Sequence, residues 1–102
     1  MSSMKINANN FNEVLNSKKP VLLDFYADWC GPRQMVSPLV DEIAEEHPEY
    51  LVGKVNVDEQ MEIAQKFDVS SIPLLIAMKD GKVIDHAVGA RPKEAILSML
   101  QR

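Results

Sequence analysis

A single cysteine, Cys30, supplies the only thiol in this sequence of 102 residues. No disulfide bond can therefore form within the chain, which is typical of proteins from reducing compartments. Basic residues are also scarce, since 11 lysines and arginines stand against 15 aspartates and glutamates and never form a run. Nucleic-acid binding requires clustered positive charge, so the net charge of −4 argues against that class of function.

Long apolar stretches are absent as well. The first six residues lack the apolar segment of a signal peptide, and no run approaches the roughly 20 residues that span a bilayer. We therefore expect a cytoplasmic protein. A length of 102 residues suits one domain, residues 1–102, with a hydrophobic core of its own.

Hydrophobic periodicity and turn signals predict five strands and four helices. The predicted strands are residues 5–7, 21–27, 50–57, 74–78 and 83–88, the last two joined by a hairpin at Asp80-Gly81. The predicted helices are residues 10–17, 32–46 (with Pro38 inside), 61–67 and 92–100. The order β-α-β-α-β-α-β-β-α predicts an α/β fold, in which helices cover both faces of a mixed sheet.

Two local details follow from the same patterns. Asn10 with Glu13 three residues later is typical of a helix N-cap with a capping box. Met35 and Met61 fall on the apolar stripes of their helices, so we expect both side chains to pack in the core.

The stretch Trp29-Cys30-Gly31-Pro32 combines the only cysteine with the only tryptophan. It follows a predicted strand, and its Gly-Pro pair leads into the longest predicted helix. A helix N-terminus has free N–H groups and a partial positive charge, which stabilise a thiolate relative to a thiol. Because the thiolate is the nucleophilic form, we expect Cys30 to be reactive; the alternative is an inert, packed cysteine.

Two charged residues near this stretch have two interpretations each. Arg33 follows one helical turn after Cys30, and its guanidinium would favour the thiolate if it lay near the sulfur. The alternative is an arginine in solvent. Asp24 lies within an apolar strand, where an isolated carboxylate is costly, so it is either a buried carboxyl or a partly hydrated one near the strand end.

The chain closely resembles the thioredoxin family over nearly its whole length. The matching segments are Asp24-Phe25-Tyr26-Ala27, Trp29-Cys30-Gly31-Pro32, Pro38, Lys54-Val55-Asn56-Val57-Asp58, Ile72-Pro73, Lys79-Asp80-Gly81 and Val88-Gly89-Ala90. Trp-Cys-Gly-Pro with a downstream Ile-Pro is a far more specific combination than a Cys-x-x-Cys pair. The resemblance implies the thioredoxin fold, with about five strands and about four helices, and a protein-disulfide oxidoreductase of cell redox homeostasis.

One part of the family pattern is changed. The family sequence Trp-Cys-Gly-Pro-Cys becomes Trp-Cys-Gly-Pro-Arg, so Arg33 replaces the second cysteine, and Gln34 stands where Lys or Arg is usual. In the family the first cysteine attacks a substrate disulfide, and the second releases the reduced substrate. This chain has the thiol for the first step only, which implies a monothiol site whose adduct an external thiol must resolve.

The resemblance implies roles for further residues. Asp24 matches a buried carboxyl that relays protons, with Lys54 as its neighbour. The Ile72–Pro73 peptide bond is implied to be cis and to lie beside Cys30. The residues implied to contact the substrate are Trp29, Gly31, Pro32, Ile72, Pro73, Gly89 and Ala90.

The implied partners are disulfide-containing proteins, with thioredoxin reductase or glutathione as the reductant. Two alternatives stay open: a binding module that keeps the docking surface without turnover, and a homodimer bridged by Cys30 through a disulfide or a shared iron–sulfur cluster. Neither His47 nor His86 has a partner at metal-ligand spacing, so no metal site is predicted. We expect no cofactor, and a monomer or weak homodimer.

Overall fold

The computed structural model describes residues 3–29, 31 and 33–102, and of Arg33 the backbone only. Five strands in these residues form one sheet in the order β1-β3-β2-β4-β5. The strands are β1 (Met4–Lys5), β2 (Val21–Tyr26), β3 (Leu51–Asn56), β4 (Leu74–Lys79) and β5 (Lys82–Val88). The helices are α1 (Phe11–Leu15), α2 (Arg33–Glu46), α3 (Met61–Lys66) and α4 (Lys93–Leu100).

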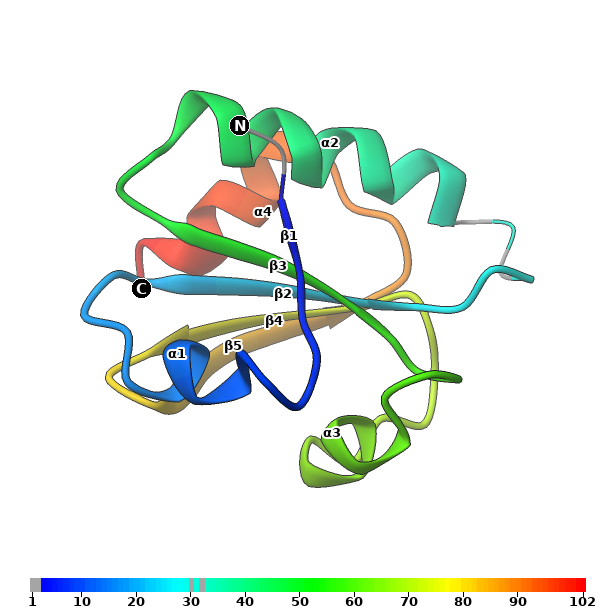
Figure 1. Cartoon of the computed structure of the whole chain (residues 1–102). Helices are drawn as coiled ribbons and strands as arrows, with labels where there is room; N and C mark the ends of the chain where they lie inside the picture. Colours follow the sequence, from blue (N-terminus) through cyan, green and yellow to red (C-terminus); the bar gives the residue numbers. More distant parts are fainter. Residues whose placement is uncertain (1–2, 30, 32) are drawn as a thin grey trace.

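The sheet is mixed and lies between two layers of helices. β1 and β2 run parallel to β3, whereas β4 is antiparallel to β2, and β5 is antiparallel to β4. α2 and α4 cover one face of the sheet, and α1 and α3 cover the other (Figure 1). The predicted α/β fold and element order are thus confirmed. No helix among the described residues is long and apolar enough to cross a bilayer.

β2 is apolar almost throughout because its two faces enter different cores. Leu23 and Phe25 pack in the cluster under α1 and α3, whereas Leu22 packs in the cluster under α2 and α4. Side chains two apart along a strand share a face, so Asp24 lies on the same side as Leu22, toward α2. The side chain of Asp24 therefore lies on the face of the sheet that α2 and α4 cover.

The hairpin between β4 and β5 has the predicted two-residue turn. Asp80 and Gly81 both have positive φ angles, of 55° and 76°, and Lys79 pairs with Lys82 across them. This conformation matches the right-handed twist of the flanking strands, which is why Asp-Gly favours it. A β-bulge follows in the same ladder, where the register shifts between Ala77 and Met78.

The predicted capping box of α1 is wrong, although Asn10 does precede the helix. Asn10 makes no side-chain cap hydrogen bond. Its Oδ1 accepts the N–H of Asn7, and its Nδ2 donates to the carbonyl of Lys5, both at 2.8 Å. The side chain therefore closes the loop after β1 and is unavailable to the helix N–H groups.

The expected burial of Met35 and Met61 is also wrong. Their side chains are 68% and 62% exposed. Val36 and Ile63, each close by in the same helix, are buried in their place. Both methionines lie in the first turn of a helix, and periodicity identifies an apolar stripe without showing how far along the helix the core extends.

We expect Gly53→Ala to lower the free energy of unfolding by about 1–3 kcal/mol. A Cβ at Gly53 would lie 2.6 and 2.7 Å from side-chain atoms of Ile6, which is fully buried and has little room to move. Urea unfolding followed by circular dichroism measures the loss. Gly31→Ala is the control, because a Cβ there meets nothing within 4 Å; equal losses in both variants would contradict the steric explanation.

Candidate active site

The segments that the sequence singles out meet at one end of the sheet (Figure 1). β2 and β3 end there together, with Tyr26 opposite Asn56, and the N–H of Val57 donates to the carbonyl of Tyr26 at 2.9 Å. Because β4 is antiparallel to β2, the loop before β4 reaches the same end. The loop after β5 joins it, since Val88 pairs with Leu74.

The start of α2 lies at this end as well. α2 begins at Arg33, and the N–H of Gln34 donates to the carbonyl of Gly31 at 3.1 Å. Cys30 and Pro32 lie outside the described residues, as does the side chain of Arg33. Their predicted roles therefore stay predictions, while the helix start that the sequence places directly after Cys30 is present.

Trp29 is held on the surface by a hydrogen bond that the sequence analysis missed. The indole is 72% exposed, and its Nε1–H donates to Oδ2 of Asp58 at 3.1 Å. Asn56, the buried last residue of β3, accepts the N–H groups of Asp58 and Glu59 with its Oδ1 at 2.9 and 3.3 Å. These bonds shape the loop that presents Asp58. The sequence offers one signal for this bond, because Asp58 is an acidic residue just after the predicted strand at residues 50–57.

The loops around Pro73 and Gly89 are joined to each other. The Ile72–Pro73 peptide bond is cis, as the family resemblance implies. The N–H of Gly89 donates to the carbonyl of Pro73 at 2.8 Å, and Gly89 has a φ of +86°, which favours glycine. Pro73 is buried, Ile72 is half-buried and Ala90 is exposed. The hydrogen bond from Gly89 to Pro73 therefore holds two of the predicted substrate-contact segments next to each other.

Asp24 is buried, with 2% of its surface exposed, and lies directly opposite Lys54 in the β2–β3 register. The ammonium of Lys54, however, donates to Oδ2 of Asp41 at 3.0 Å and to Oγ of Ser37. Ser37 and Asp41 are four residues apart on α2 and so share one face of that helix. Neither residue is among the predicted site residues, although their i, i+4 spacing on a predicted helix is visible in the sequence.

Asp41 is the centre of this polar group. Its Oδ1 accepts a hydrogen bond from Oγ of Ser3 at 2.7 Å, which connects the start of the chain to α2. Burial raises the pKa of the Asp41 carboxyl, but hydrogen bonds from Ser3 and Lys54 and the charge of Lys54 outweigh burial. The net result is a pKa below the usual value for aspartate.

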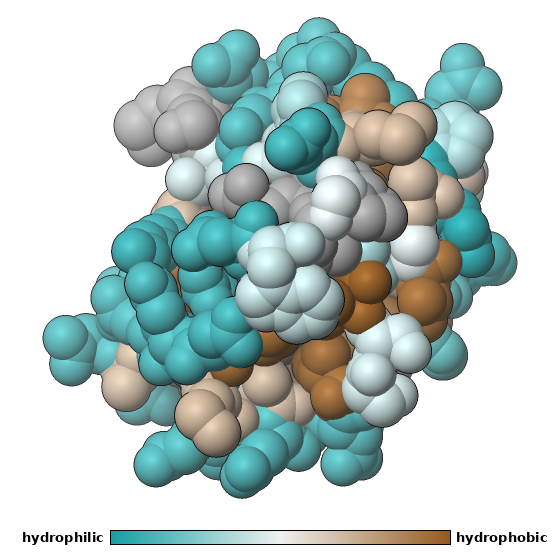
Figure 2. Space-filling model, turned by 90° about the vertical axis from the view of Figure 1, so that its right-hand side faces the viewer, coloured by the Kyte–Doolittle hydropathy of each residue, from teal (hydrophilic) through white to brown (hydrophobic). Residues whose placement is uncertain are grey.

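Apolar side chains are exposed around this end of the molecule. Figure 2 views it directly and shows pale and brown residues near the centre of this face, with hydrophilic residues bordering them, most of all on the left. The exposed apolar residues include Trp29, Met35 and Val88. Met35 also lines a mostly apolar hollow of about 340 Å³ together with Ala90 and Pro92. Exposed apolar area of this kind is typical of a protein-docking surface.

Among the residues that the structure describes, no group of three or more histidine, cysteine, aspartate or glutamate side chains lies close enough together to hold a metal ion. The site is thus a helix start, an exposed tryptophan, a cis-proline loop and a buried aspartate at one end of a sheet.

Known proteins are similar to this chain in both sequence and fold. The chain matches the thioredoxin family over residues 2–102. It is 47% identical to thioredoxin 1 of Synechococcus elongatus over 91 residues, which cover 88% of this chain and 85% of that protein. Thioredoxin of Chlamydia caviae is 39% identical over 97 residues, covering 95% and 94%.

Solved structures of other proteins have the same fold as this chain. A mutant thioredoxin from Halobacterium salinarum superposes with a TM-score of 0.89 at 32% identity, covering 98% of this chain and 88% of that one. A chain from a study of thiol resolution in yeast mitochondrial 1-Cys peroxiredoxin by glutathione/thioredoxin systems has a TM-score of 0.85 at 30% identity, covering 98% and 94%.

We expect Asp58→Ala to lower the fluorescence anisotropy of Trp29, because the indole loses the acceptor that restrains it. Trp29 is the only tryptophan, so the emission reports on this site alone. Glu59→Ala is the matched control, since it removes the same charge from the next residue. Unchanged anisotropy in Asp58→Ala, or an equal fall in both variants, would show that the bond does not restrain the ring.

Asp41 should contribute to stability in a pH-dependent way. Folding lowers its pKa, so its contribution is complete above the usual carboxyl pKa of about 4 and is lost as the pH falls through the lowered value. We expect Asp41→Asn to cost at most about 1 kcal/mol at pH 7, because solvent screens this partly exposed pair, and to cost less at pH 3.

Urea unfolding at both pH values measures this difference. Glu45→Gln, which neutralises an exposed carboxylate on the same helix, is the control. A cost for Asp41→Asn that is the same at pH 7 and pH 3 would contradict the assigned role of the ionised carboxylate.

Proposed function

Since this chain belongs to the thioredoxin family of thiol–disulfide redox proteins, we propose that it exchanges disulfides through Cys30 alone. The Cys30 thiolate attacks one sulfur of a substrate disulfide, and the other substrate sulfur leaves as a thiolate. The product is a mixed disulfide between Cys30 and the substrate. The thiolate of an external thiol such as glutathione then attacks the substrate sulfur of this bond, so that a substrate–glutathione disulfide forms and Cys30 leaves as a thiolate.

The replacement at position 33 is the observation on which this proposal depends. Arg33 is the first residue of α2 and occupies the place of the family's second cysteine. The chain contains no other thiol that could resolve the adduct internally. The fourteen-residue helix that begins there supports the first step, because its N-terminus favours a nearby thiolate. We assign the guanidinium of Arg33 the same effect.

Asp24 is the residue we assign to proton transfer. Its burial between the sheet and α2, opposite Lys54, supports this role. With no second thiol to deprotonate, its remaining task would be to exchange a proton with Cys30 or with the departing substrate thiolate. Lys54 would act as a positioning residue, since its ammonium is held on α2 by Asp41.

We propose that the substrate docks on the surface around Cys30. The proposed contact residues are Trp29, Gly31, Pro32, Ile72, Pro73, Gly89 and Ala90. Two observations support this assignment. The indole ring of Trp29 is exposed and can contact a substrate, and the hydrogen bond from Gly89 to Pro73 holds the two neighbouring loops together.

The partners we propose are disulfide-containing proteins and a small thiol. Thioredoxin-family proteins act on such substrates together with reductase or glutathione systems. A monothiol site favours glutathione, because each turnover needs a thiol from outside the chain. The cytoplasm maintains such a pool and is the location we propose.

The test is a comparison of intact masses after reaction with a protein disulfide. We expect wild type to accumulate a covalent adduct at Cys30 that glutathione releases. Arg33→Cys should accumulate little adduct and instead form an internal disulfide, because the restored thiol attacks the mixed disulfide. It should also gain insulin-reducing activity with thioredoxin reductase. Cys30→Ser is the negative control.

Three experimental outcomes would contradict this proposal or favour one of the alternative functions. If DTNB leaves Cys30 unmodified at neutral pH, the proposed attack does not occur. If Cys30→Ser keeps full affinity for a partner, the chain is better described as a binding module. A coloured preparation, or a dimer that only reductant dissociates, would favour a bridge between two Cys30 thiols.

A further inference from the structure

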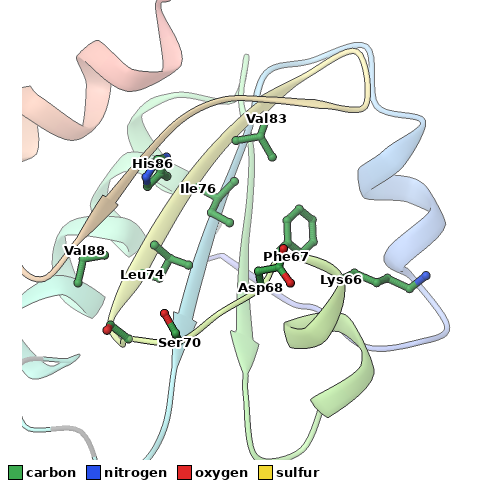
Figure 3. Close-up of a pocket in the computed structure, with 10 residues that line it drawn as sticks. Lys66, Phe67, Asp68, Ser70, Leu74, Ile76, Val83, His86 and Val88 are labelled. Atoms are coloured by element: carbon green, nitrogen blue, oxygen red, sulfur yellow. The ribbon is translucent and has the colours of Figure 1, made fainter.

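A groove lies beside the candidate active site on the face of the sheet that carries α1 and α3 (Figure 3). Its volume is about 440 Å³. Leu74 and Ile76 of β4 form an apolar floor, and Val83, His86 and Val88 of β5 form one wall. The end of α3 and the segment after it lie along the other side, where Lys66, Phe67 and Asp68 contribute one aromatic and two charged side chains. The groove is thus apolar at its base and open to solvent.

The groove exists because α3 covers only the middle of this face. Phe67, directly after α3, contacts Phe25 of β2 at 5.3 Å and Phe11 of α1 at 6.0 Å between ring centroids. These contacts place the helix end over β2 and leave β5 uncovered. Val83 and Val88 are consequently 49% and 48% exposed. Two uncovered valines on a single strand form an apolar surface that a partner could bury.

The dimensions of the groove suit an extended chain. Residues 83 to 88 of a strand that rises about 3.4 Å per residue span about 17 Å, the length of about five extended residues. An extended segment directs alternate side chains to one side. Such a segment would place two or three apolar side chains against the exposed Val83 and Val88 and keep its other side chains in water.

The groove is continuous with the proposed substrate-contact residues. Ser70 and Ser71, which line it, directly precede Ile72–Pro73. Val88, at the same end, directly precedes Gly89, whose N–H is bonded to Pro73. A polypeptide docked at Ile72 and Pro73 therefore has its neighbouring residues at the mouth of the groove.

We propose that this groove binds the extended segment next to the disulfide cysteine of a protein substrate and selects apolar side chains at alternate positions. This inference rests on the proposed exchange reaction of Cys30. It adds a specificity site on β4 and β5 to the residues that contact the disulfide itself. Small disulfides, which have no flanking chain, would not use it.

The kinetic test uses two synthetic peptides whose central cysteine is disulfide-linked to thionitrobenzoate. One peptide has valine at alternate positions on both sides of the cysteine, and the other has serine there. We expect wild type to release thionitrobenzoate about tenfold faster from the valine peptide, the effect of about one buried apolar side chain. Val83→Asp should lose most of this preference, because it places a charge against the apolar segment.

Two controls separate the groove from the chemistry. Ser98→Asp adds the same charge on α4, on the opposite face of the sheet, and should keep the preference. All three proteins should react equally fast with DTNB. A wild type without preference, or a Val83→Asp variant that retains it, would overturn the groove assignment while leaving Cys30 exchange intact.

A binding measurement covers the case in which Cys30 does not react. The valine peptide with its cysteine replaced by serine is titrated into ¹⁵N-labelled protein. Shifts at the amides of Val83, His86 and Val88 would support the groove, even if DTNB inertness had refuted the exchange reaction. Absent shifts would overturn it. Shifts that depend on protein concentration without peptide would also overturn it, by identifying a second copy of the chain as the occupant.

Discussion

The burial of β2 on both faces is the constraint on which the rest of the structure depends. Its alternate residues enter two separate cores, so its register with β3 and β4 is fixed: a slip of one residue would exchange the faces. That register places the carboxyl ends of β2 and β3 together and the first residue of β4 beside them. The proposed active site is built from the segments that this pairing brings to one end of the sheet.

One charged residue interrupts this apolar strand. Asp24 lies on the face that packs against α2, where Ser37 and Asp41 hold the ammonium of Lys54. A buried carboxyl costs free energy that a leucine at this position would not. Local departures from good packing are expected where a protein has chemistry to perform, and the exposed Trp29, next to the proposed nucleophile, fits that description as well.

Much of this arrangement could be predicted because it follows from local patterns. The apolar run of β2, the Asp80-Gly81 turn and the order of elements are visible in the sequence itself, and the family motif adds the cis bond at Pro73. Local patterns mark Asp58 and the Ser37–Asp41 pair as polar residues on suitable elements, but they do not show that Asp58 bonds Trp29 or that Asp41 bonds Lys54 and Ser3, because these partners are 13 or more residues apart in the chain. The prediction that Met35 is buried was wrong, because an apolar stripe on a helix does not show whether another element covers each of its residues.

The β-bulge in the β4–β5 ladder has a consequence for solubility. β5 is an edge strand with two exposed valines, and a flat strand of that kind invites pairing with the same strand of another molecule. The register shift between Ala77 and Met78 increases local twist, and Lys82 places a charge at the start of the strand. The chain can thus keep an uncovered apolar strand while discouraging the edge-to-edge growth that leads to aggregates.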